Sequence, residues 1–598
     1  MPKDSKRTPA IDYTNRDFSS IRDDLTQIAE RFYPDTFQDF SEASFGSMML
    51  DAVAYVGDQL SFYLDYNVNE TFLDTSYQLD NVFRHGRVLG FKNSGRPSTF
   101  GQVAMYVLVP ASISGLGPDT RYIPVVKRGT RFTSQNGLNF VLTENIDMAD
   151  SSNPVVVARA DGTTGAPTFY AIKAYGNVVS GFFNTETVEV GAFQRFRRIL
   201  LSSPNVSEII SVFDSEGNEY FEVEYLSQDV IFKELTNKNF KNDNVPSVMK
   251  PMLVNRKFTT VFDQSGVSIQ FGSGDELASE VVADPQNVAM EVFGKNYVTD
   301  VTFDPSRLAN NKYYGIVPQN TTLTILYRQT NPANSNVGAN SLTTVGNSIM
   351  DFGDLTGLAT ATVSQVRNSL EVTNETPIVG NVTNLSPFEI KQRIYDTFPT
   401  QNRAVTQKDY ENLVYRMPSK FGSIKRCSVQ KDPDSQKRNL NVYVISEDPQ
   451  NKLIKSNDTI KTNLKTWLNH YRMINDTIDI LDPFIINFGI NFIIKPQPRA
   501  DKFQVLDACV SALAEQFSTP LFIGERLSIS TIFNILNDVK GVNDVVKVNL
   551  VNKNSSNYSS VFFDIEDNMS PDGDYLLTPA NAILEMKFPA VDIKGKLR

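Results

Sequence analysis

Cysteine, histidine and tryptophan are scarce in this chain of 598 residues, which contains two, two and one of them. Cys427 and Cys509 lie far apart and form no C-x-x-C pair, which excludes a disulfide framework. His85 and His470 have no ligand-like neighbours nearby in sequence. We interpret each histidine as a helix-surface or capping residue, and we expect no metal site.

Positive charge is also in short supply. The net charge of −11 argues against a nucleic-acid-binding function, because phosphates require a positive field. The best basic patch, Arg195 to Arg198, is interpreted as a surface or inter-subunit salt-bridge cluster. The stretch from Met1 to Lys6 lacks the apolar run of a secretory signal, so we expect synthesis and residence in a reducing cytosol.

No motif indicates catalytic chemistry. Phe271 to Gly274 has the glycines of a phosphate loop, but no Gly-Lys-Ser/Thr follows, and we interpret it as a hairpin turn. Asp432 and Asp434 imitate half of a calcium loop that lacks its glycine and its closing glutamate. Glu276 and Glu280 would share a helix face, but nothing nearby indicates a pocket. We predict a protein that is not an enzyme and has no catalytic, cofactor-binding or metal-binding residues.

The strongest pattern that is present predicts a helix over residues 18–32. Apolar residues recur there at steps of three and four, which places them on one helix face. We expect Thr14 to cap this helix and Pro34 to end it. The face consists of Phe18, Ile21, Leu25, Ile28 and Phe32.

A second helix is predicted over about 45–66, and a short third one over 79–89. Asp51, Asp58 and Asp65 recur at seven-residue steps in the second helix, with serines in the same stripe. These residues form only a narrow polar face for contact with solvent. These aspartates also argue against a membrane span. We expect the helix to be covered from more than one direction, as in a bundle. Its apolar surface comprises Met48, Met49, Val53, Val56, Leu60 and Leu64.

The apolar faces of these helices must be buried against another protein surface. Burying the first stripe alone would release roughly 8–15 kcal/mol gross, whereas isolated helices of this length are marginal in water. One interpretation is a helical subdomain that docks on its own chain, and the other is a surface kept for other subunits. We predict inter-subunit contacts at Phe18, Ile21, Leu25, Ile28, Phe32, Met49, Val53, Val56, Leu60 and Leu64.

The whole sequence predicts a multidomain α+β protein, with about 150 residues per domain as a guide. Residues 329–385 are rich in Asn, Thr, Ser and Gly, so we expect a long polar arm, with one short helix near 362–372, that a second subunit orders. The expected regions are a helical segment at 1–95, a β-rich part at 96–328, the arm at 329–385, an α+β domain at 386–500 and a C-terminal α+β region at 501–598.

Taken in order, several segments resemble the baseplate wedge proteins of contractile-tailed, T-even-like bacteriophages, in the Baseplate J-like family. The resemblance covers nearly the whole chain. The matching segments are Asp12 to Phe18, Phe45 to Asp51, Arg87 to Phe91, Lys127 to Phe132, Ile269 to Gly274, Pro318, Tyr327 to Arg328, Gly338 to Asn340, Arg403 to Tyr410 and Gly541 to Val545.

The resemblance implies a structural subunit of the virion tail, assembled in the host cytoplasm. Two copies of such a protein clasp one larger wedge partner through helices, and residues 501–598 would serve dimerisation. Six wedges join into a ring around the tail hub, and rearrangement of the ring triggers sheath contraction. No nucleic acid or membrane is implied as a partner. The alternatives are a carbohydrate-binding or carbohydrate-degrading tail component, and the equivalent baseplate part of a secretion system or tail-derived bacteriocin.

Overall fold

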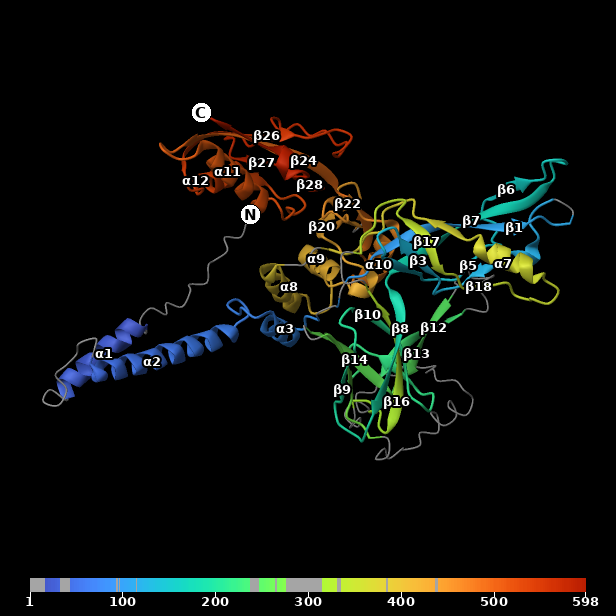
Figure 1. Ribbon diagram of the computed structural model, residues 1–598, viewed down its shortest axis with the longest axis horizontal. Coiled ribbons are helices and arrows are strands. Elements are labelled where there is room, and N and C mark those ends of the chain that lie inside the picture. The colour runs from blue at the N-terminus through green and yellow to red at the C-terminus, as the bar shows by residue number, and fades with distance from the viewer. Residues whose placement is uncertain are drawn as a thin grey trace. The chain divides into compact units, whose positions relative to one another are not determined.

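The computed structural model describes residues 17–32, 44–92, 95, 97–113, 116–236, 247–263, 266–275, 314–330, 335–382, 386–435 and 439–598. The chain divides into two compact units, Met1–Asn93 with Leu385–Gln401 and Ser94–Asn384 with Asn402–Arg598. Helices make up the described part of the first unit, and strands dominate the second (Figure 1). The predicted multidomain α+β fold class is confirmed.

Three of the four described helices of the first unit begin at side-chain caps. The Asp17 carboxylate accepts from the Ser20 N–H at 3.0 Å, Ser44 caps the next helix, and Ser386 with Pro387 opens the last one as predicted. The expected Thr14 cap and the Pro34 stop lie outside the described residues. The helices are α1 (Phe18–Phe32), α2 (Phe45–Glu70), α3 (Leu79–Val88) and α8 (Pro387–Thr400).

Helices α3 and α8 pack against each other although some 300 residues of sequence separate them. Val82 and Gly86 of α3 are buried, and so is Ile394 of α8. A Cβ atom on Gly86 would lie 2.9 Å from Ile394 Cδ1, so the close approach of the two helices depends on this glycine. This pair forms the base from which α2 extends.

The first sheet of the second unit is built on a long antiparallel pair, β1 (Phe100–Pro110) with β7 (Pro167–Ser180). Alternate residues of β1, from Val103 to Val109, are buried, as the sequence predicted. Its other strands are β3 (Arg131–Ser134), β4 (Asn139–Leu142), β6 (Val155–Ala160), β17 (Leu342–Asn347) and β19 (Glu371–Thr373). Beside it lie η2 (Thr120–Tyr122) and a small sheet of β2 (Val125–Val126), β5 (Ile146–Asp147) and β18 (Met350–Asp351).

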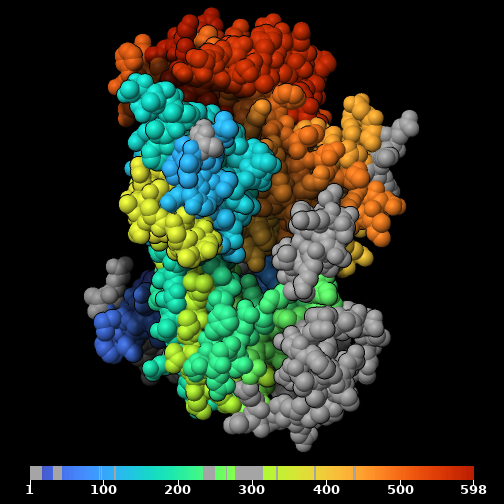
Figure 2. Space-filling view, turned by 90° about the vertical axis from the view of Figure 1, so that its right-hand side faces the viewer, coloured from blue at the N-terminus to red at the C-terminus, as the bar shows by residue number. Residues whose placement is uncertain are grey.

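The prediction of a polar arm over 329–385 that a second subunit orders is wrong for its described residues. β17 pairs with β3, and β19 pairs with β1, within the first sheet. Figure 2 shows this stretch, in yellow, lying against the blue and cyan surface of the same sheet. The short helix was predicted correctly and is α7 (Thr360–Asn368). Apolar residues from the whole stretch join the core of the sheet, among them Leu342, Val366, Leu370, Val372 and Ile378.

The second sheet carries its own core, which includes Ile269, Phe271, Ile325 and Tyr327. Its strand order is β8 (Phe182–Val190), β16 (Thr321–Gln329), β10 (Val206–Phe213), β11 (Glu219–Glu222), β14 (Lys257–Asp263), β15 (Gly266–Phe271) and β9 (Arg198–Leu200). A separate ribbon consists of β12 (Val230–Thr236) and β13 (Ser247–Leu253).

Two α+β modules follow. The middle module contains α9 (Gln407–Tyr415), η3 (Ser419–Phe421), β20 (Arg426–Lys431), β21 (Asn439–Glu447), β22 (Leu453–Lys455), α10 (Asp458–Asn469) and β23 (Thr477–Leu481). The C-terminal module contains β24 (Phe484–Pro496), α11 (Lys502–Gln516), β25 (Leu527–Ser528), α12 (Ile529–Asn537), β26 (Val542–Asn552), β27 (Tyr575–Leu576), β28 (Ala582–Glu585), α13 (Pro589–Asp592) and β29 (Ile593–Leu597).

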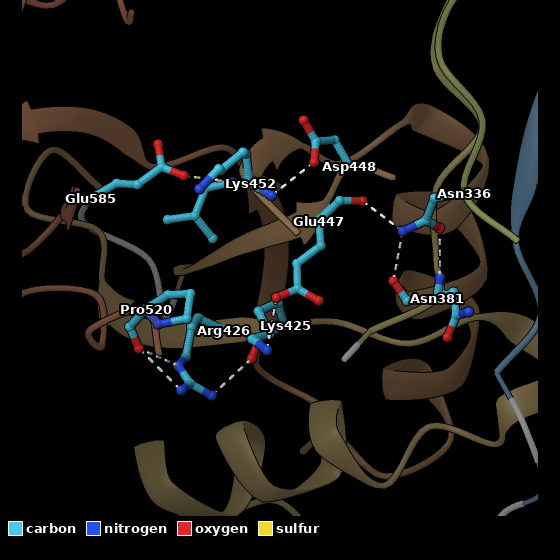
Figure 3. A network of polar contacts seen from close by, with 10 residues as sticks. Asn336, Asn381, Lys425, Arg426, Glu447, Asp448, Lys452, Pro520 and Glu585 are labelled. Carbon is cyan, nitrogen blue, oxygen red and sulfur yellow. Dashed lines mark hydrogen bonds and ion pairs between the residues drawn. The ribbon is translucent and has the colours of Figure 1, made fainter. Parts of the chain in front are cut away.

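A buried polar junction joins the middle module to the first sheet (Figure 3). Lys425 Nζ and Glu447 Oε1 lie 2.7 Å apart, and both side chains are almost fully buried. Asn336 Nδ2 donates to the backbone carbonyls of Glu447 and Asn381, each at 2.8 Å. Buried polar groups that are all paired in this way hold packed segments in one register.

The same junction continues into the C-terminal module (Figure 3). Arg426 Nη2 donates to the Pro520 carbonyl at 3.1 Å, and its guanidinium lies 4.5 Å from the centre of the Phe522 ring. The Glu585 carboxylate accepts from the Leu453 N–H at 2.7 Å, and burial raises the pKa of this carboxyl. The middle module is therefore bonded on both sides within the second unit.

Candidate interaction surface on the N-terminal helices

Helix α1 covers one narrow stripe of α2. Ser47 and Ala54 of α2 are buried there, and a Cβ on Gly57 would lie 3.3 Å from Ile21 Cδ1. Arg22 closes the contact, with its Nε 2.6 Å from Asp51 Oδ1 and its Nη2 donating to Ser47 Oγ at 3.3 Å. The sequence predicted that this Ser/Asp stripe is the solvent-exposed face of α2. This prediction is wrong for the part of α2 that α1 covers, because there the small and acidic residues face α1.

The opposite side of α2 is bare. Its apolar residues follow one another at steps of three and four, so they form a continuous stripe. Their exposed fractions lie between 49% and 62%. Among the described residues of the first unit no element covers these side chains, although the sequence predicted cover from several directions. We call this the α2 apolar stripe, which consists of Met49, Val53, Val56, Leu60 and Leu64.

Charge is distributed unevenly around α2. The helix contains Asp51, Asp58, Asp65 and Glu70 but no Lys, Arg or His. The aspartates lie on the side of α2 that faces α1, away from the α2 apolar stripe. Burying the stripe therefore desolvates no charged group of α2, so docking avoids that cost. Half-exposed side chains of this kind would contribute about 4–7 kcal/mol gross when covered.

Aromatic residues add exposed surface to α2 beyond the predicted set; Phe45 and Tyr63 border the α2 apolar stripe, whereas Phe62 lies on another side of the helix. Phe45, Phe62 and Tyr63 are more than half exposed. Phe62 also stacks on Tyr66, with ring centres 6.3 Å apart. The sequence prediction did not include them, and Phe62 lies outside the three- and four-residue spacing of the stripe. Large aromatic side chains are common at the centres of protein interfaces.

The residues predicted on α1 divide into two groups. Ile21 and Leu25 are half-buried, and Ile21 packs on α2 beside Gly57. Phe18 and Ile28 are exposed, at 37% and 51%. The Phe32 side chain lies outside the described residues. One part of the apolar face of α1 thus packs on α2, and the other part is exposed to solvent.

The histidines have structural partners. His85 Nε2 lies 2.8 Å from the carbonyl oxygen of Glu70, and His470 is the C-cap of α10. In the described residues no group of three His, Cys, Asp or Glu side chains could hold a metal ion. None of the described helices combines the length and hydropathy of a membrane span. The described N-terminal helices therefore present an apolar surface that suits binding to another apolar surface.

Residues 17–88, the segment that carries this surface, match the family model described as "Bacteriophage baseplate protein, N-terminal domain". The N-terminal helices are therefore similar to this domain of bacteriophage baseplate proteins. The match begins at the Asp17 cap of α1 and ends at the last residue of α3, so it covers all three N-terminal helices. It covers less than half of the chain.

Two baseplates are among the solved structures that match. The cryo-EM structure of the anti-feeding prophage baseplate has 9% identity and a TM-score of 0.28, and the match covers 96% of this chain and 99% of that chain. The TssK-TssF-TssG baseplate subcomplex of the type VI secretion system has 9% identity and a TM-score of 0.24, with 73% and 95% covered. These scores are too low to establish a shared fold. No curated protein matches the chain.

Proposed function

We propose that this protein is a structural, non-enzymatic subunit of a contractile-tail baseplate wedge. It pairs with a second copy of itself, clasps a larger wedge partner through α1 and α2, and links wedges into a ring around the tail hub. Rearrangement of that ring triggers sheath contraction. The family match of residues 17–88 and the resemblance of further segments support this role.

The single observation that carries the proposal is the bare, charge-free α2 apolar stripe. A helix of 26 residues with this much exposed apolar surface is poorly stable in water unless something covers it. Because α1 covers the opposite, polar side, the surface left over suits another helix. We propose that Phe18, Ile28 and the α2 apolar stripe contact other subunits. Ile21 and Leu25 would contribute indirectly, by holding α1 against α2.

The decisive experiment compares assembly of the wild-type chain with that of the double variant Val56→Asp/Leu60→Asp. Burying two carboxylates in the interface should weaken association at least tenfold, because unpaired charges cannot be desolvated cheaply. Sedimentation velocity on the full chain measures self-association. Complementation of a tail lacking the protein measures incorporation into particles.

A control is Leu116→Asp, which changes a leucine in the second unit that is 91% exposed, against 59% for Leu60. We expect this variant to assemble like the wild type. Normal assembly of Val56→Asp/Leu60→Asp, or a wild-type chain that stays monomeric and enters no tail particle, would overturn the proposal.

Two further observations test the alternative functions. Neighbouring genes distinguish a phage tail from a secretion system or bacteriocin, and a glycan array tests carbohydrate binding.

A further inference from the structure

The corner between α2 and α3 is organised by one carboxylate. Glu70 is the last residue of α2, and its side chain turns back over the connection to α3. It accepts from Ser76 Oγ at 2.9 Å, Tyr77 N at 2.7 Å, Gln78 N at 3.2 Å and Asn81 Nδ2 at 2.8 Å. Two backbone and two side-chain donors from one short stretch thus converge on a single residue.

These bonds replace the missing cap of α3. Gln78 is the N-cap of α3 but makes no side-chain capping bond. An acidic group is unfavourable at the C-terminus of its own helix and favourable at the N-terminus of the next one. Glu70 occupies both positions, so its charge is useful only while α3 starts at this corner.

Two further contacts tie the corner to the base formed by α3 and α8. The Glu70 carbonyl lies 2.8 Å from His85 Nε2 on α3, and Lys391 Nζ of α8 donates to the Asp74 carbonyl at 2.9 Å. Within the turn, Thr75 Oγ1 donates a hydrogen bond to the Asn69 carbonyl at 2.7 Å. Glu70 thus joins the end of α2 to α3 through its side chain and also through its backbone carbonyl.

We propose that Glu70 is a positioning residue that sets the direction in which α2, with its apolar stripe, leaves the α3 and α8 base. This inference rests on the proposed function, because a fixed direction matters only if α2 docks on a partner. A pre-set helix direction reduces the conformational entropy lost on docking. Removing the carboxylate should leave both helices formed but widen the range of their relative orientations.

The test measures distances between nitroxide labels on the full chain by double electron–electron resonance. Labels are placed on Ala52→Cys in α2 and Gln392→Cys in α8, both at exposed positions. The native Cys427 and Cys509 are buried, so they should not take up label. We expect one narrow distance distribution with Glu70, and at least a twofold wider distribution with Glu70→Ala.

Two variants separate positioning from simple unfolding. Asn81→Ala removes one donor and keeps the carboxylate, so it should give a smaller widening, and circular dichroism should show unchanged helix content. Asp58→Asn removes a charge from the same helix and should leave the distribution narrow. Equal widths for Glu70 and Glu70→Ala would overturn the inference, and so would equal widening by Asp58→Asn.

The positioning role and the proposed function fail separately. Val56→Asp/Leu60→Asp should weaken assembly at least tenfold and leave the distance distribution narrow, since neither residue takes part in the contacts at the corner. Glu70→Ala should widen the distribution and lower the assembly affinity by several fold. A widened distribution with unchanged assembly would refute the link between Glu70 and docking, whatever the role of the stripe.

Discussion

The α1–α2 hairpin and the C-terminal module contain the same kind of apolar pattern with opposite outcomes. In the C-terminal module, alternate residues of β24 from Ile486 to Ile494 are buried beneath α11 and α12. In α2, an equally regular stripe remains half exposed. A periodic apolar face therefore predicts that something must cover it, but not which chain provides the cover.

The largest expected effect is in the covered region. Phe492→Ala, deep in the C-terminal core, should lower the free energy of unfolding by about 4 kcal/mol, because it removes a buried ring and leaves a cavity. Chemical denaturation of the full chain measures this loss. Leu60→Ala on the α2 apolar stripe should change stability by less than about 0.5 kcal/mol. A large loss from Leu60→Ala would mean that the chain itself covers the stripe.

The buried junction of the second unit should come next. Lys425→Met leaves the Glu447 carboxylate buried without its cation, at an expected cost of about 3 kcal/mol. The double variant Lys425→Met/Glu447→Leu removes both charges and should recover most of that stability. A double variant as unstable as Lys425→Met would show that the pair itself, rather than the orphaned charge, stabilises the junction. Thermal unfolding followed by fluorescence compares the three proteins.

The contact between α1 and α2 should be weaker and more local. Gly57→Leu places a branched side chain where Ile21 already packs, and overpacking of this kind costs about 2 kcal/mol. We expect α1 amides to lose protection in hydrogen exchange while the sheets keep theirs. Ala52→Leu, at an exposed position of the same helix, is the matched control. Unchanged protection of α1 in Gly57→Leu would contradict the packing.

The smallest effect is acid dependence at the α2–α3 corner. Desolvation opposes ionisation of Glu70, but the donors from Asn81, Tyr77, Ser76 and Gln78 outweigh it and lower the pKa to about 2, from an ordinary 4.5. The ionised carboxylate therefore stabilises the corner fully above pH 4.5, and this contribution is lost as pH falls toward 2.

The label distances described above can follow this titration. The wild-type distribution should widen between about pH 4.5 and about pH 2, whereas Glu70→Gln should be insensitive over that interval. Asp58→Asn, which retains Glu70, should widen as the wild type does. A wild-type distribution that stays constant through this range, or one that widens equally in Glu70→Gln, would assign the acid response to other groups.

Local sequence signals predicted the long elements well. Ser386 and Pro387 marked the start of α8, and the alternation from Phe484 to Ile494 gave β24 with its end at Pro496. Capping groups and side-chain periodicity act over a few residues, so they can be interpreted without knowledge of the rest of the fold. The arm failed as a prediction because its order comes from pairing with β3 and β1, strands that lie far away in the sequence, and from side-chain amides. Asn374 Oδ1, for example, accepts from the backbone N–H groups of Ser341 and Leu342 at 2.9 and 2.8 Å.

The sequence by itself determined that the N-terminal helices carry more apolar surface than they can hide, and which residues form it. The tertiary structure decided which side of α2 its own chain covers. α1 packs on the serine, alanine and glycine positions because small side chains allow close approach of two helices, and Arg22 compensates Asp51 there. Hydrophobic burial has no direction, so a periodic pattern cannot specify its partner. Only the packing of α1 shows which face of α2 is left over.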